Sequence, residues 1–100
     1  MITDNNKNFL ARFGSEKHID KFINDEEPYV RTNVARNPNL QTHHIDRLLN
    51  DEHHQVRASV VGNPNLKPHH IDKLSNDRDS YVRATLARHQ RFKLIKLISS

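Results

Sequence analysis

The sequence predicts an all-α protein, a short solenoid of about four two-helix repeats. The first observation behind this prediction is a 26-residue repeat, because residues 25–50 and 51–76 are identical at 15 of 26 aligned positions. The second is that each repeat contains helically spaced apolar residues twice, on either side of an Asn-Pro-Asn-Leu break. A fixed period of this size is typical of stacked helical pairs, because one pair alone cannot bury its apolar face.

The first helix of each repeat is predicted from apolar residues at positions i, i+4 and i+5. These residues are Val30, Val34 and Ala35; Val56, Val60 and Val61; and Val82, Leu86 and Ala87. Asn37 and Asn63 each precede a proline, which disfavours helical geometry and removes an amide donor, so the helix is expected to stop there. Asp25, Asp51 and Asp77 precede the three helices and are expected to cap their free amides.

The second helix of each repeat follows the Asn-Pro-Asn-Leu break. Ile45, Leu48 and Leu49 have i, i+3, i+4 spacing, and Ile71 and Leu74 repeat it. Pro68 falls where this helix should begin, a position at which a missing amide costs little.

The two ends of the chain are expected to differ from the middle. We interpret residues 1–24 as a degenerate N-terminal cap, with helices over 5–13 and 15–24 joined at Gly14, and with Phe9, Leu10 and Phe13 facing Ile19, Phe22 and Ile23. Residues 25–50 and 51–76 are full repeats, and residues 77–100 are a C-terminal repeat and cap. In this last part we expect a helix over 81–88 and a separate short helix over 92–98. The whole chain, residues 1–100, is expected to form a single domain.

The composition excludes several classes of protein. The chain has no cysteine, so disulfides, zinc–thiolate sites and thiol nucleophiles are excluded. No apolar stretch approaches the roughly 20 residues that span a bilayer, and the N-terminus is polar, so we expect a soluble cytoplasmic protein without a membrane segment. The net charge is +4. Residues 1–50 hold 7 basic and 7 acidic side chains, whereas residues 51–100 hold 9 and 5, so the excess lies in the second half.

One set of residues recurs as a motif in each repeat: Asp25, Val30, Arg31, Val34, Ala35, Arg36, Asn37, Pro38, Asn39 and Leu40, with their counterparts from Asp51 and Asp77 onward. In these residues the repeat resembles the leucine-rich repeat variant family. The family is similar to HEAT-like repeats, so the resemblance implies a right-handed solenoid that serves as a binding scaffold. The family's usual unit is nearer 24 residues, and its founding member carries a cysteine-ligated iron–sulfur module that this cysteine-free chain cannot hold.

Side chains that could carry chemistry recur in register with the repeat. The histidine pairs 43–44, 53–54 and 69–70 suggest metal ligands, but equivalent histidines in neighbouring repeats should lie too far apart for one ion, so we expect a solvated array and no metal site. Arg31, Arg57 and Arg83 each follow an aspartate by six residues and are expected to form an internal Asp–Arg ladder. No nucleophile–base pair and no glycine-rich phosphate loop is visible, so we expect neither an enzyme nor a cofactor.

The function predicted from these observations is a non-catalytic scaffold that binds a protein partner. Side chains that vary between equivalent repeat positions are the candidate contacts, because stacking does not dictate them: Tyr29, Arg36, Gln55, Tyr81 and Arg88. A small bacterial or phage protein that modulates a larger protein would fit this description.

Two further hypotheses concern the C-terminal end. The alternative function is nucleic-acid binding through Arg83, Arg88, Arg91, Lys93 and Lys96, since some HEAT-like solenoids, including a family of DNA glycosylases, cradle duplex DNA. The small charge excess and the few aromatic residues weigh against it. The apolar residues between 92 and 98 also exceed what one helix can bury on one side, so a homodimer through the C-terminal helix is expected.

Overall fold

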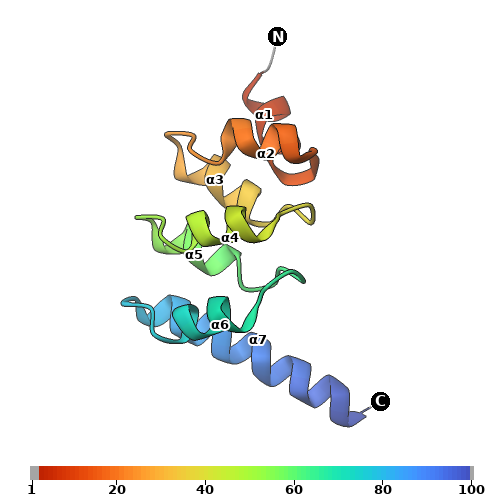
Figure 1. Cartoon of the computed structure of the whole chain (residues 1–100), viewed down its shortest axis with the longest axis vertical. Coiled ribbons are helices and arrows are strands. Elements are labelled where there is room, and N and C mark those ends of the chain that lie inside the picture. Colours follow the sequence, from red (N-terminus) through yellow and green to blue (C-terminus); the bar gives the residue numbers. More distant parts are fainter. Residues whose placement is uncertain (1–2, 100) are drawn as a thin grey trace.

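The computed structural model describes residues 3–99, and every regular element in that part of the chain is a helix. This confirms the all-α class (Figure 1). The expected domain, 1–100, includes residues 1, 2 and 100, which lie outside the described part. The helices are α1 (Asp4–Phe13), α2 (Glu16–Phe22), α3 (Pro28–Ala35), α4 (Thr42–Leu48), α5 (His54–Ser59), α6 (Pro68–Ser75) and α7 (Ser80–Ser99).

The helices form two rows along the long axis of the molecule. In the first row, α1 packs on α3, α3 on α5 and α5 on α7. The second row consists of α2, α4 and α6, which alternate with the first row along the chain and are joined to one another by side-chain hydrogen bonds. The molecule measures 48 × 32 × 21 Å, and successive helical pairs are stacked along its length in Figure 1.

The core lies between the rows and is built from residues that are 26 positions apart. Val30, Val56 and Val82 are all at most 1% exposed, and each lies in a helix of the first row. Ile19 and Ile45 occupy the corresponding place in the second row and are fully buried. The expected equivalence therefore holds for the Val30, Val56 and Val82 column, whereas Ile71, the counterpart of Ile45, is only partly buried.

Both first-row helices that precede an Asn-Pro-Asn break end before it. Helix α3 stops at Ala35, two residues before Asn37, as predicted. Helix α5 stops at Ser59, four residues before Asn63, so Val60 and Val61, which are expected in this helix, lie in turns instead. The buried Asn37 side chain donates from Nδ2 to the carbonyl oxygens of Ala11 (2.9 Å) and Gly14 (3.0 Å), and Asn63 repeats this bond toward Asn37 (3.2 Å). Each asparagine thus satisfies backbone carbonyls of the preceding pair, which ties neighbouring pairs together.

The packing predicted for the N-terminal cap is wrong in part. Phe9 and Phe13 are 62% and 58% exposed and contact each other, whereas Ala11 is fully buried in their place. The reason is that α1 packs closely on α3, and a small side chain suits this contact. Gly14 makes the turn as expected, because a Cβ there would clash with the Leu10 carbonyl oxygen.

The two separate helices expected near the C-terminus are in fact one helix, α7, of 20 residues. Where the other repeats have Asn-Pro-Asn-Leu, this segment reads His89-Gln90-Arg91-Phe92, and without a proline nothing removes an amide or blocks helical geometry. Residues 92–98 therefore continue the first row rather than supplying a second helix. Within the described residues, no helix combines the length and apolarity needed to cross a bilayer.

Candidate interaction surface

The Arg–Asp ladder, formed by Arg31 with Asp51 and by Arg57 with Asp77, ties neighbouring pairs together. The Arg31 guanidinium donates from Nε and Nη2 to both carboxylate oxygens of Asp51, at 2.8 and 3.1 Å, and Arg57 makes the same two bonds to Asp77. Each arginine also donates from Nη1 to the carbonyl of the aspartate six residues before it. The predicted ladder is confirmed for these two arginines, whereas Arg83 is exposed and makes only the carbonyl bond.

The aspartates of the ladder also hold the backbone that precedes each helix of the first row. Oδ1 of Asp51 accepts the His53 amide at 3.0 Å, and Asp25 and Asp77 accept the amides two residues after them. Burial raises the pKa of Asp51, but the hydrogen bonds from Arg31 and the His53 amide outweigh it, so the pKa lies below its ordinary value. The same balance lowers the pKa of Asp77, through Arg57.

The histidines do not form the expected solvated array. His44 and His70 are at most 2% exposed. Nδ1 of His44 accepts the Gln41 amide at 3.0 Å, so the ring proton resides on Nε2, which donates to Asp20 at 2.8 Å. His70 repeats the arrangement with Lys67 and Asp46. The expectation failed because an imidazole three residues after the N-cap can satisfy a free amide and thereby enter the core.

Two groups of side chains have the atoms that a metal ion needs. Glu16, Asp20, His43 and His44 place one ligand atom each within 4.8 Å of one another, and Asp46, His69 and His70 do the same. The rings of the adjacent histidines lie together in both groups, with centroids 4.0 and 3.9 Å apart. However, the buried ring in each group carries its proton on Nε2 and uses Nδ1 as a cap, so binding a metal would disrupt that cap.

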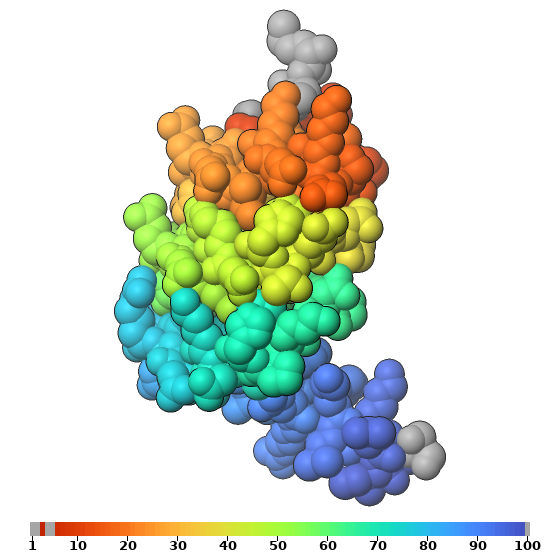
Figure 2. Space-filling model, viewed as in Figure 1, coloured from red at the N-terminus to blue at the C-terminus, as the bar shows by residue number. Residues whose placement is uncertain are grey.

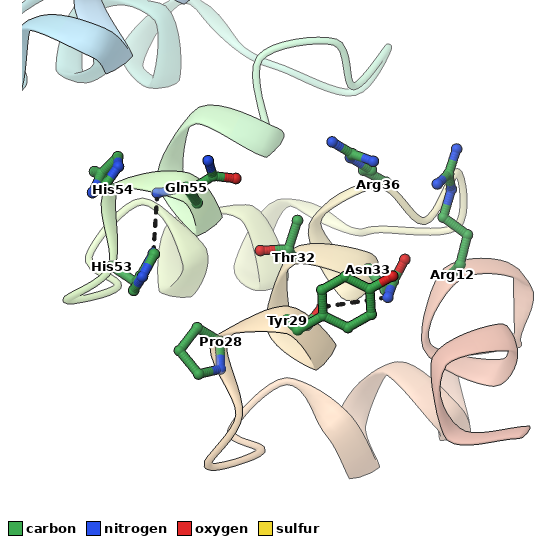
Figure 3. Close-up of a pocket in the computed structure, with 9 residues that line it drawn as sticks. All are labelled: Arg12, Pro28, Tyr29, Thr32, Asn33, Arg36, His53, His54 and Gln55. Carbon is green, nitrogen blue, oxygen red and sulfur yellow. Dashed lines mark hydrogen bonds between the residues drawn. The ribbon is translucent and has the colours of Figure 1, made fainter. Parts of the chain in front are cut away.

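The outer face of the first row contains two open grooves. The tyrosine groove has a volume of about 560 Å³ and lies over α1, α3 and α5. It is lined by Arg12, Pro28, Tyr29, Thr32, Asn33, Arg36, His53, His54 and Gln55. In Figure 3, the groove has Arg12 and Arg36 on one side, His53, His54 and Gln55 on the other, and Thr32 between them.

The glycine groove adjoins the tyrosine groove and continues along the first row to α7. It is lined by Arg36, Ala58, Ser59, Val61, Gly62, Thr85, Arg88, His89 and Phe92. Arg36 lines both grooves, so the two form one continuous face. A Cβ built at Gly62 meets no atom within 4 Å, which shows that the centre of this groove is open.

The structure brings the candidate partner-binding residues together on this face. Tyr29, Arg36 and Gln55 line the tyrosine groove, and Arg88 lines the glycine groove. Tyr81 stands edge-on to His54, with ring centroids 5.8 Å apart, at the margin of the tyrosine groove. All five side chains are exposed. Residues from three helices therefore share one surface.

Sequence reasoning missed several residues of the grooves. The position of His53 is occupied by Glu27 and Asp79 in the other repeats, and that of His54 by Pro28 and Ser80. Both positions vary between repeats, as those of the candidate contacts do, so this variation could have identified them. Arg12 gave no such signal, because its segment lacks the Asn-Pro-Asn break that would align it with the repeats.

The cations of the nucleic-acid alternative are not gathered on one face. Arg83, Arg88, Arg91, Lys93 and Lys96 all lie on α7, and all are exposed. At 3.6 residues per turn their directions around the helix axis are spaced by roughly 60–80°, so they surround it evenly. A phosphate backbone would meet only two or three of them at once.

The second half of α7 exposes large apolar side chains. Phe92, Leu94, Ile95, Leu97 and Ile98 are between 51% and 75% exposed. Figure 2 shows this end of the helix extending beyond the body of the molecule. Leu94, Ile95 and Ile98 point away from the side that buries Val82 and Leu86, so the stacked pairs cannot cover them.

Comparisons with known proteins identify no relative of this chain. Protein-family models, curated proteins and solved structures yield no match to this chain.

Proposed function

We propose that the chain is a non-catalytic cytoplasmic scaffold that binds a protein partner through the two grooves on the first row of helices. The observation that carries this proposal is the convergence of Tyr29, Arg36, Gln55, Tyr81 and Arg88 on one exposed face. The residue type at these positions changes from one repeat to the next, whereas the neighbouring core positions keep the same residue type. Stacking therefore does not account for which residues occupy the face. Tyrosine and arginine are enriched among the residues that dominate protein interfaces.

The architecture that we propose is a short right-handed α-solenoid of the leucine-rich repeat variant type. The stacked helical pairs, the Arg–Asp ladder and the asparagine bonds all recur at 26-residue spacing, which supports this assignment. Three helical pairs are followed by α7, which takes the place of the first helix of a fourth pair. Helical repeats of this kind present extended binding faces because each unit adds one helix to a continuous surface.

Affinity capture with substituted proteins tests the function. The immobilised chain should retain a protein partner from the native cell extract, and Tyr29→Ala combined with Arg36→Ala should abolish retention. The matched control combines Lys17→Ala with Lys21→Ala, two exposed residues on α2 in the second row. Retention by the groove variant, or loss of retention by the control alone, would contradict the proposal. Circular dichroism should show the same helix content for all three proteins.

We also propose that two copies of the chain pair through the C-terminal end of α7, residues 94–98, beyond Phe92, which lines the glycine groove. The supporting observation is the exposure of four large apolar side chains in this segment, Leu94, Ile95, Leu97 and Ile98. Light scattering should give twice the monomer mass for the intact chain and the monomer mass for a version that ends at Gln90. A monomeric intact chain would rule out this pairing.

A further inference from the structure

The continuous face of the two grooves is basic. Arg12 and Arg36 line the tyrosine groove, and Arg36 and Arg88 line the glycine groove. No carboxylate is among the described residues that line either groove. A ligand on this face would therefore meet only positive or neutral side chains at close range.

These three arginines are not used to hold the fold together. Within the described part of the chain, Arg12, Arg36 and Arg88 form no ion pair, whereas Arg31, Arg47 and Arg57 all bind aspartates. Arg12 instead lies over the Phe13 ring, 5.4 Å from its centroid. Arg36 and Arg88 are exposed and Arg12 is half-buried, and a guanidinium that forms no ion pair can donate a fork of hydrogen bonds to an incoming carboxylate.

A cluster of acidic side chains lies in a different hollow. Asp25, Glu26, Asp51 and Glu52 line this hollow, at the start of the first-row helices, where Arg31 and Arg47 partly neutralise them. The two surfaces thus differ in charge, with four acids at this hollow and the unpaired arginines along the grooves. Such a separation orients an acidic partner toward the grooves before contact.

Exposed aromatic side chains accompany the arginines. Tyr29 is 67% exposed and Phe92 is 64% exposed, and these two residues lie in the tyrosine and the glycine groove respectively. A fitting ligand would bury these rings as well as pair with the guanidinium groups. The mixture favours a polypeptide with both acidic and apolar side chains over a nucleic acid, whose backbone would need a denser row of cations.

We propose, on the basis of the scaffold function above, that the grooves bind an acidic segment of the partner protein, with carboxylates on Arg12, Arg36 and Arg88 and apolar side chains on Tyr29 and Phe92. Gly62 leaves room for this segment between Arg36 and Arg88, in the position that arginine occupies in the neighbouring repeats. The specificity of the surface for acidic sequences then depends on charges that the fold itself does not need.

A defined peptide tests this proposal without knowledge of the partner. The probe is a fluorescein-labelled peptide of about twelve residues that alternates glutamate with leucine and tyrosine, which can span roughly 40 Å when extended. Its control has glutamine at every glutamate position, and a labelled DNA duplex tests the nucleic-acid alternative. Fluorescence anisotropy with the full chain should show binding of the acidic peptide that weakens as salt is added, and much weaker binding of the other two probes.

Substitutions at Gly62 provide a matched pair of variants. Gly62 has no positive φ, and its Cβ direction is open, so both Gly62→Glu and Gly62→Gln should fold. Gly62→Glu places a carboxylate between Arg36 and Arg88 and should weaken binding of the acidic peptide about tenfold relative to the isosteric Gly62→Gln. Gly62→Arg should strengthen it.

A charge-reversal pair completes the test. Arg36→Glu should abolish binding of the acidic peptide, and Lys17→Glu, which changes the net charge equally on the second row, should weaken it less than twofold. Equal binding of the glutamine peptide, equal effects of Gly62→Glu and Gly62→Gln, tighter binding of DNA, or no binding of any probe would each overturn the acidic-segment proposal. The capture experiment would still decide the scaffold function, because it assumes nothing about the charge of the partner.

Discussion

Arg31 and Arg36 are five residues apart in the chain, yet they serve different purposes. Arg31 is 5% exposed and makes two bonds to Asp51, whereas Arg36 is exposed and lines both grooves without an ion pair in the described part of the chain. Arg31 recurs in every repeat, as Arg57 and Arg83, but Arg36 is replaced by Gly62 in the next repeat and returns as Arg88. At these two positions, the recurring arginines Arg31 and Arg57 bind aspartates that hold the stack together, whereas the varying position carries an arginine without an ion pair in the described part of the chain.

The largest effect should come from breaking the Arg–Asp ladder. Arg31→Met should lower the free energy of unfolding by about 3 kcal/mol, because it removes the bidentate partner of the buried Asp51 carboxylate and leaves it only the longer contact with Arg47 and the His53 amide. Urea denaturation followed by circular dichroism measures this change. The control is Arg83→Met, in the same repeat position but exposed, which should cost less than about 1 kcal/mol. Equal costs would mean that the ladder adds no stability.

A smaller effect is expected at the buried histidines. His70→Ala removes a cap on the Lys67 amide, the bond to Asp46 and a fully buried ring, so it should cost about 2–3 kcal/mol. The neighbouring His69 is exposed, and His69→Ala should change the free energy of unfolding by less than about 0.5 kcal/mol. Thermal denaturation of the two variants side by side distinguishes a structural from a solvated imidazole.

Acid should lower the stability that Asp25, Asp51 and Asp77 give to the fold. The pKa values of Asp25, Asp51 and Asp77 are lower in the folded chain than their ordinary value, so these carboxylates stabilise the fold above the unfolded pKa of about 4. That contribution is lost as the pH falls through the lower folded values. Denaturation at a series of pH values should show the loss below about pH 4, and Arg31→Met should reduce its size.

The smallest effect on stability should be found in the grooves. Tyr29→Ala and Arg36→Ala should each change the free energy of unfolding by less than about 0.5 kcal/mol, because both side chains are exposed and neither forms an ion pair in the described structure. The same variants should lose partner capture. If either variant unfolds the chain, the distinction between stacking residues and binding residues does not hold at that position.

Local signals in the sequence predicted much of this structure. Helices α3 and α5 both end before their Asn-Pro-Asn break, although α5 ends earlier than predicted, and the Val30, Val56 and Val82 column is buried. The failures involve contacts that no local signal records. The burial of Phe9 and Phe13 was expected from helical spacing alone, and it did not occur because Ala11 fits the close packing of α1 on α3.

The sequence by itself determined that the chain is helical, where most helices end and which residues repeat, because helical spacing and proline act within a few residues. Only the tertiary structure decided which polar side chains are buried and which remain free. His44 enters the core through a bond to Asp20, 24 residues away, and Asp51 is held by Arg31, 20 residues away. Such bonds require the stacked pairs to meet in three dimensions, and the same stacking joins residues of α3, α5 and α7 into one exposed face.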